Sequence, residues 1–222
     1  MRSTPTVALL VTLLTWVWSS GVPASALAGE LDDGREIALV IDTSRSMRGN
    51  DPGRYTLLIA QILGDLLADD DGLTVIRMAK KETGCDTGAD PRLTRRLDPR
   101  DRISFERQLE PLLRFNTGTN FAAALRTAMS VLDRVPERRR LLLVIADSGG
   151  LGPCAKVFES ELLALRARGV ELAAIHLGKR SGAFDGHPAF AATRTAADSE
   201  ELVATVAAIY QRFLGARRVQ TG

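Results

Sequence analysis

The sequence predicts an α/β domain, with a doubly wound, mostly parallel sheet and helices on both of its faces. Short continuous apolar runs, typical of strands buried on both faces, alternate with longer segments in which apolar residues recur at helical spacing. Two of these runs end at an aspartate, Asp42 and Asp147, and no internal repeat or linker interrupts the alternation. Such alternation is typical of parallel α/β folds.

The first part of the domain predicts a strand, a helix and a second strand. Residues 36–41 form the first strand, and Asp51 followed by Pro52 offers an N-cap and a first helical residue. The apolar face of that helix contains Tyr55, Leu58, Ile59, Ile62, Leu63, Leu66 and Leu67. The run 69–72 ends the helix in a turn that we expect to be solvated, with an acidic metal site as the alternative. Residues 73–78 form the second strand.

The middle of the chain is polar and irregular over residues 80–103, where we expect a solvated loop that contains a hairpin return. The alternative for this segment is a patch for an acidic partner. Its basic residues are Arg92, Arg95, Arg96, Arg100 and Arg102. A short helix is expected over 105–113, and Thr119 can cap a further helix. The apolar face of that further helix contains Phe121, Leu125, Ala128, Met129 and Leu132.

The last part predicts two strong strands, a weaker one and two helices. Residues 141–146 form the most hydrophobic strand, followed by a helix at 157–165, a strand at 170–177 and a weaker strand near 189–193. Asp198 and Glu201 have capping-box spacing at the start of the last helix. One side of that helix contains Leu202, Val203, Val206, Ile209, Tyr210 and Phe213.

Composition excludes several classes of protein. The 222 residues include 29 basic and 27 acidic side chains, with a formal net charge of +2 and 45% hydrophobic residues. Intrinsic disorder is excluded because the apolar content is high and the net charge small. Binding of nucleic acid through bulk positive charge is not expected, since acids nearly cancel bases. Two cysteines do not make a disulfide framework or a cysteine-ligated zinc domain.

Residues 1–28 resemble a secretory signal peptide. Arg2 precedes an apolar stretch at 7–18, and Ala26-Leu27-Ala28 is a small-x-small cleavage site. The stretch is shorter than the roughly 20 residues that span a bilayer, so an uncleaved anchor is the weaker alternative. We expect cleavage near Ala28 and a periplasmic or secreted protein with no membrane span. Residues 29–34 then form a short segment, 35–214 the domain and 215–222 a C-terminal tail; the excess of arginine over lysine is typical of a GC-rich bacterial genome.

Export makes a disulfide between Cys85 and Cys154 the default expectation. The alternative is two free or buried thiols.

Oxygen-bearing side chains follow the strands that end at aspartates. Asp42, Ser44 and Ser46 alternate along an extended turn, so their side chains can converge. Thr119 stands at a helix start between the two strands, and Asp147 ends the later one. Ligands of doubly wound sheets bind beyond the carboxyl ends of the strands. This set of oxygens suits a hard cation such as Mg²⁺ (or Mn²⁺) better than zinc or copper.

Three segments follow one another in the sequence: the one from Asp42 to Ser46, the one around Thr119, and the apolar strand that ends at Asp147. Together they resemble the von Willebrand factor type A domain and its metal-ion-dependent adhesion site. The resemblance covers about residues 35–214. It implies hydroxyl ligands at Ser44, Ser46 and Thr119, and carboxylates at Asp42 and Asp147 that bind the ion directly or through water. One coordination position stays open for a Glu or Asp of a protein partner. The third segment departs from the family, because Asp147 is followed by Ser148 where glycine is common.

The resemblance also implies an arrangement for the cysteines. In the sheet order of the family, both would leave the sheet at the edge that carries the metal loops, where a disulfide would pin that edge.

The resemblance implies an exported, non-enzymatic binding module for adhesion, assembly or an accessory role. The alternative is a metal-dependent phosphoester hydrolase that uses Asp42. Ser44 disfavours that alternative, because such enzymes usually carry a second aspartate at this position. His176 and His187 form no spacing that predicts a metal site or acid–base chemistry, so we expect His176 to be packed and His187 to lie in a loop.

Overall fold

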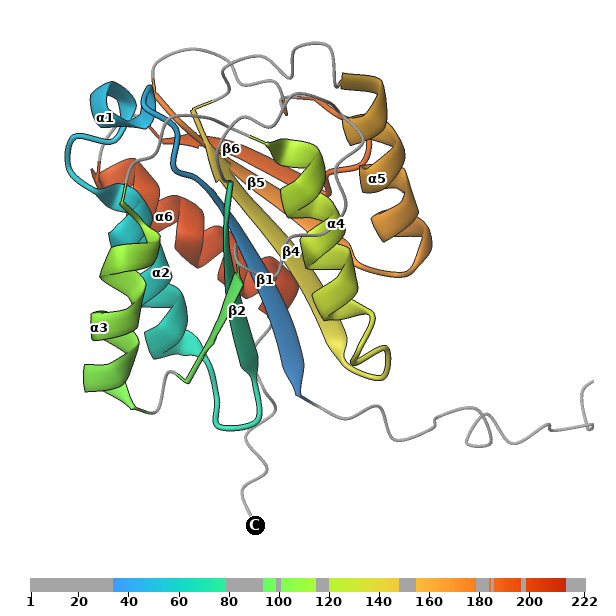
Figure 1. The fold of residues 1–222 in the computed structure, drawn as a ribbon, viewed down its shortest axis with the longest axis horizontal. Helices are drawn as coiled ribbons and strands as arrows, with labels where there is room; N and C mark the ends of the chain where they lie inside the picture. Colours follow the sequence, from blue (N-terminus) through green and yellow to red (C-terminus); the bar gives the residue numbers. More distant parts are fainter. Residues whose placement is uncertain are drawn as a thin grey trace, which may run out of the picture. The chain divides into compact units, whose positions relative to one another are not determined.

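The strands of the computed structural model form one sheet with helices on both faces (Figure 1). The structure describes residues 34–78, 94–98, 101–114, 120–147, 155–178, 184, 186–196 and 199–214. The strands are β1 (Arg35–Asp42), β2 (Gly72–Met78), β3 (Thr94–Leu97), β4 (Arg139–Ala146), β5 (Glu171–Leu177) and β6 (Ala192–Ala196). The helices are α1 (Met47–Asn50), α2 (Tyr55–Leu66), α3 (Arg102–Leu112), α4 (Phe121–Leu132), α5 (Ala155–Ala167), α6 (Ser199–Ile209) and the π-helical turn η4 (Tyr210–Leu214).

The strand order is β3-β2-β1-β4-β5-β6. β3 runs antiparallel to β2 at one side of the sheet, and every other pairing is parallel. This confirms the predicted mostly parallel, doubly wound sheet and the hairpin return before residue 103. We call the edge at which the parallel strands end the carboxyl edge, and the edge at which they begin the amino edge.

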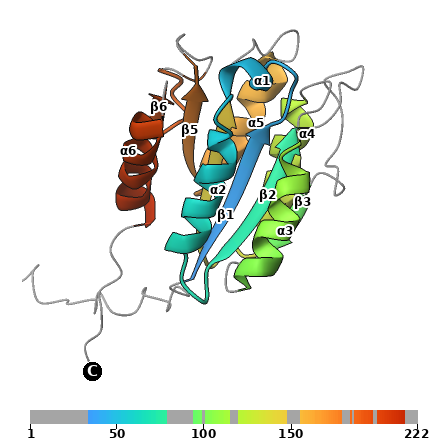
Figure 2. The same cartoon turned by 90° about the vertical axis from the view of Figure 1, so that its left-hand side faces the viewer.

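Two hydrophobic cores lie on the two faces of the sheet. Side chains of α2, α3 and α6 pack on one face, against residues such as Leu39 and Leu143. Side chains of α4 and α5 pack on the other, against Val40 and Val144. Figures 1 and 2 show the same division of helices between the faces. The central strands are buried on both sides, which explains why their sequences are continuously apolar.

Helix starts differ from the sequence prediction at several places. α3 begins at Arg102, three residues before the predicted start, with Asp101 as its N-cap, whose Oδ1 accepts from the Ser104 N–H at 3.0 Å. α2 begins at Tyr55, so the prediction of Pro52 as its first residue is wrong. The N-cap is Arg54 and not Asp51 as predicted, and Arg54 has a left-handed φ of 54°. The Asp51 carboxylate still accepts from the backbone N–H groups of Tyr55 and Thr56 at the start of the helix, and Pro52 lies in the preceding turn. The N-cap of α4 is Asn120, whose Oδ1 accepts from the Ala123 N–H at 3.0 Å. Thr119, the cap that the sequence predicts, lies outside the described residues.

Several other expectations are also corrected. The weak strand near 189–193 is β6, which begins three residues later. Val203 is 49% exposed and does not share the buried side of α6. Short helix α1 has no clear signal in the sequence.

The aspartate run before β2 is only partly solvated. Asp71 is buried and accepts hydrogen bonds from the backbone N–H groups of Arg35 and Ala68, both at 2.9 Å. The Arg96 guanidinium likewise pairs with the fully buried Glu36, Nη1 to Oε1 2.5 Å, so this arginine of the basic segment has a partner within the domain. Asp71 and Arg96, which the sequence assigns to solvent, therefore have partners within the domain at the amino edge.

Candidate functional site

The carboxyl edge brings two of the predicted ligands to neighbouring strands. Asp42 is the last residue of β1, and Asp147 directly follows β4, which pairs with β1 in parallel. Neighbouring strands lie about 4.8 Å apart. From β1 the chain continues to β2 on one side of the sheet, whereas β4 lies on the other, so strand order reverses between β1 and β4. Doubly wound sheets bind their ligands at this point.

The turn after β1 gathers three oxygen-bearing side chains. Asp42 Oδ1 accepts from the Ser44 N–H at 2.8 Å, which folds the chain back over the end of the strand. The hydroxyls of Ser44 and Ser46 lie 2.8 Å apart, Oγ to Oγ, so the two side chains converge. Asp42 and Ser44 are buried, 3% and 8% exposed, while Ser46 is exposed. These three side chains form a half-buried group of oxygens that opens to solvent.

Thr43 anchors the same turn to the sheet. Its Oγ1 donates to the Met78 carbonyl oxygen at 2.8 Å, and its side chain is buried. Thr43 thus points into the sheet while its neighbours Asp42 and Ser44 supply oxygens to the group above the strand. The alternation of an extended chain accounts for this division over residues 42–44. The predicted extended conformation ends there, because the Met47 N–H donates to the Ser44 carbonyl oxygen at 3.2 Å and Ser46 has helical dihedral angles. The Ser46 hydroxyl therefore reaches Ser44 through a tight turn and not through alternation.

Asn50 connects this first loop to the second aspartate. Its Nδ2 donates to Asp147 Oδ2 at 3.0 Å, across 97 residues of sequence. α1 therefore has a structural role, because it follows the serine turn and positions Asn50 beside Asp147 at the end of β4. Asn50 is not among the site residues predicted from the sequence, and no local signal could reveal it, since the contact depends on β1 and β4 being neighbours.

His176 and Gly178 complete the described surroundings of Asn50. A Cβ atom at Gly178 would stand 3.7 Å from Asn50 Oδ1 and 3.9 Å from His176 Nε2. His176 is 2% exposed, and within the described residues its Nδ1 has no hydrogen-bond partner, which confirms a packed histidine. His187 lies in a turn, as expected, and its Nδ1 accepts from the Ala189 N–H at 3.2 Å.

The other predicted site residues are Thr119, Cys85 and Cys154. All three lie outside the described residues, as do the residues that follow Asp147 in the third loop.

The donor set fits a hard divalent cation. Asp42, Ser44, Ser46 and Asp147 supply carboxylate and hydroxyl oxygens, and Mg²⁺ binds through one or two carboxylates with several neutral ligands. Among the described residues no three His, Cys, Asp or Glu side chains cluster in a way that could hold a metal. Zinc sites depend on such clusters, whereas a site made of two carboxylates and hydroxyls does not.

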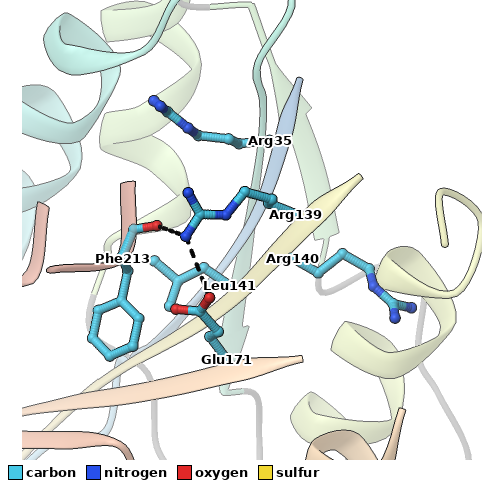
Figure 3. Close-up of a pocket in the computed structure, with 6 residues that line it drawn as sticks. All are labelled: Arg35, Arg139, Arg140, Leu141, Glu171 and Phe213. Carbon is cyan, nitrogen blue, oxygen red and sulfur yellow. Dashed lines mark hydrogen bonds and ion pairs between the residues drawn. The ribbon is translucent and has the colours of Figure 1, made fainter. Parts of the chain in front are cut away.

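A pocket at the opposite edge offers a contrast (Figure 3). It is lined by Arg35, Arg139, Arg140, Leu141, Glu171 and Phe213. Arg139 Nη2 donates to the Phe213 carbonyl oxygen at 2.8 Å and pairs with Glu171 at 3.4 Å. This pocket therefore joins the C-terminal turn η4 to the amino edge, and its charges are paired within the chain.

Comparison with known proteins identifies the fold. The family model of the von Willebrand factor type A domain matches residues 37–150. No curated protein is significantly similar in sequence.

Solved structures share the architecture at low identity. A von Willebrand factor type A protein from Catenulispora acidiphila superposes with a TM-score of 0.62 at 16% identity, covering 82% of this chain and 43% of that one. Proximal thread matrix protein 1 of the mussel byssus gives 0.61 at 17% identity, covering 81% and 46%. Manganese-loaded TRAP protein of Plasmodium vivax gives 0.54 at 18% identity, covering 80% and 72%. This chain spans less than half the length of the first two, and the likeness shows the fold alone.

Proposed function

Because the chain belongs to the von Willebrand factor type A domain family, we propose that it binds a divalent cation at the carboxyl edge and grips an acidic residue of a protein partner through that ion. Domains of this family often mediate protein interactions and metal-dependent adhesion, and they are typically non-enzymatic. The proposed ligands are Asp42, Ser44, Ser46, Thr119 and Asp147, and the ion is Mg²⁺ or Mn²⁺.

The observation that carries the proposal is the convergence of the Ser44 and Ser46 hydroxyls beside Asp42. Two hydroxyl oxygens 2.8 Å apart can both face one ion of the size of Mg²⁺, whose ligands lie about 2.0–2.1 Å away. Because only two of the five proposed ligands are charged, the ion stays electrophilic, which favours an incoming carboxylate. A manganese-loaded relative of the same fold adds support for a divalent ion.

Isothermal titration calorimetry with Mg²⁺ tests the metal site. The wild type should release or absorb heat that saturates, whereas Asp42→Ala and Asp147→Ala should give only the heat of dilution. Asp69→Ala is the matched control, because Asp69 is an exposed aspartate in the turn before β2, and it should behave as the wild type. Equal heats in all four proteins would overturn the proposal.

We also propose export, with cleavage near Ala28 and a disulfide between Cys85 and Cys154. No helix of the described residues is long and apolar enough to cross a bilayer. Closing the loop between these cysteines would stabilise the domain by about 4 kcal/mol in the chain-entropy model. Counting free thiols in denatured, unreduced protein tests the bond, and two free thiols would contradict it.

A further inference from the structure

We infer that the partner presents several carboxylates, because exposed arginines border the metal site on the side of α1. This inference rests on the proposed metal site and specifies the chemistry of what binds there. Arg45 stands between Ser44 and Ser46, and Arg48 follows within α1. The Arg48 N–H donates to the Arg45 carbonyl oxygen at 3.2 Å, so a single turn separates the two residues.

Both side chains are exposed. In the part of the chain that the structure describes, neither takes part in an ion pair or a side-chain hydrogen bond. By contrast, arginines of the amino edge are paired: Arg96 and Arg138 with Glu36, and Arg139 with Glu171.

Arg77 adds a third positive charge near the same edge. It is the penultimate residue of β2 and pairs in register with Ile41, the neighbour of Asp42. Leu73 and Val75 pack in the core on the face of α2 and α3, so by alternation Arg77 faces that side too. Its buried Nε has no hydrogen-bond partner among the described residues.

The carboxylates nearest in sequence to these arginines are already engaged. Asp51 is 1% exposed and accepts hydrogen bonds from Tyr55 and Thr56 at the start of α2. Asp42 holds the Ser44 N–H, and Asp147 accepts from Asn50. Arg45 and Arg48 therefore have no described acidic neighbour with which to pair.

Charge balance then indicates the partner. A bound divalent ion cancels the charges of Asp42 and Asp147, and the charges of the arginines remain. A partner with one carboxylate would neutralise only part of this excess. A short acidic segment, with one carboxylate on the ion and others beside it, would match the edge. Complementary charge of this kind speeds association and selects among partners.

A peptide selection tests the inference directly. A random displayed library is selected on the full chain in Mg²⁺ at low salt, and the best peptide is synthesised. We expect peptides with two or more acidic residues, whose binding is abolished by EDTA. Selected peptides with one acid and neutral neighbours would overturn the inference.

Variants of the arginines provide the second arm. Arg45→Gln/Arg48→Gln should weaken binding of the acidic peptide by about 2- to 30-fold, since each exposed pair contributes modestly. Arg134→Gln is the matched control, because Arg134 is an exposed arginine in the turn before β4, and it should bind the peptide as the wild type does. Equal affinity of the double variant and the wild type would overturn the inference.

Two further measurements separate the inference from the proposed function. If the wild type binds no Mg²⁺ in calorimetry, the proposed metal site is wrong. If binding of the acidic peptide depends on the arginines but resists EDTA, the inferred acidic partner is supported and the role of the ion is overturned. A DNA duplex of about 20 base pairs that binds as tightly as the peptide would overturn the assignment of a protein partner.

Discussion

The two edges of the sheet treat polar side chains in opposite ways. At the amino edge, Glu36 is completely buried between Arg96 and Arg138, and Asp71 is bound by Arg35. At the carboxyl edge, the hydroxyls of Ser44 and Ser46 meet each other, and the arginines of the same turn have no described ion-pair partner. The described charges of the amino edge pair with one another, whereas we propose that the oxygens of the carboxyl edge bind a ligand.

The contrast teaches that charge alone does not mark a functional site. The amino edge has charged residues and a pocket (Figure 3), yet these residues form ion pairs within the chain. The candidate metal site has few charges, and its oxygens come from two carboxylates and from hydroxyls. Substitutions at the amino edge should therefore change the free energy of unfolding, and those at the carboxyl edge should change ligand binding.

The largest expected effect is on stability at the amino edge. Glu36→Ala removes the buried carboxylate that pairs with two arginines, and it should lower the free energy of unfolding by about 3 kcal/mol. Urea denaturation measures this change. Glu137→Ala, an exposed glutamate near the same edge, should change stability by less than about 0.5 kcal/mol. An unchanged urea midpoint for Glu36→Ala would remove the assigned stabilising role of this cluster.

At the carboxyl edge, the largest effect should be the loss of stabilisation by metal. Mg²⁺ at roughly 100 times its Kd stabilises a protein that binds it only when folded by about 2.7 kcal/mol. Thermal unfolding of the wild type should show this shift, and Asp42→Ala should not respond to Mg²⁺. If Mg²⁺ stabilises Asp42→Ala as much as the wild type, the ion binds elsewhere. Glu36→Ala is the control, and Mg²⁺ should still stabilise it because Glu36 lies at the other edge of the sheet.

A glycine beside Glu36 gives the third prediction. A Cβ at Gly72 would collide with the Glu36 carboxylate and would stand 2.5 Å from Arg96 Nη2. Gly72→Ala should therefore destabilise the domain by about 2 kcal/mol, as expected for overpacking. Gly49→Ala is the control, because nothing lies within 4 Å of a Cβ at that position. Equal Tm values for the two variants would show that the buried carboxylate can move aside freely.

The smallest effect should come from Asn50, which positions Asp147. Asn50→Ala should weaken Mg²⁺ binding by about 10-fold, at the lower end of the range for residues that orient metal ligands, because the bond is exposed. Calorimetry with Mg²⁺ measures the change in Kd. An unchanged Kd for Asn50→Ala would mean that the hydrogen bond from Asn50 does not position Asp147 for the ion.

The sequence alone determined the order of elements and the segments that form the candidate site. Apolar runs predicted β1, β2, β4 and β5, because strands buried on both faces are apolar over most of their length. The spacing of Asp42, Ser44 and Ser46 predicted that Ser44 and Ser46 converge, which the structure confirms, although a turn after Ser44 and not an extended chain brings Ser46 there. The role of Thr119 as a metal ligand and the disulfide between Cys85 and Cys154 stay predictions.

Tertiary structure decided which polar groups meet. Asn50 and Asp147 are 97 residues apart, and Glu36 and Arg96 are 60 apart. Local patterns cannot predict such pairs, because their formation depends on strand order and register. The same reason explains the error at Asp71, which local sequence assigns to a solvated turn and which the start of β1 buries against Arg35. Sequence determined where strands end, and the packing of strands decided which of these ends lie side by side.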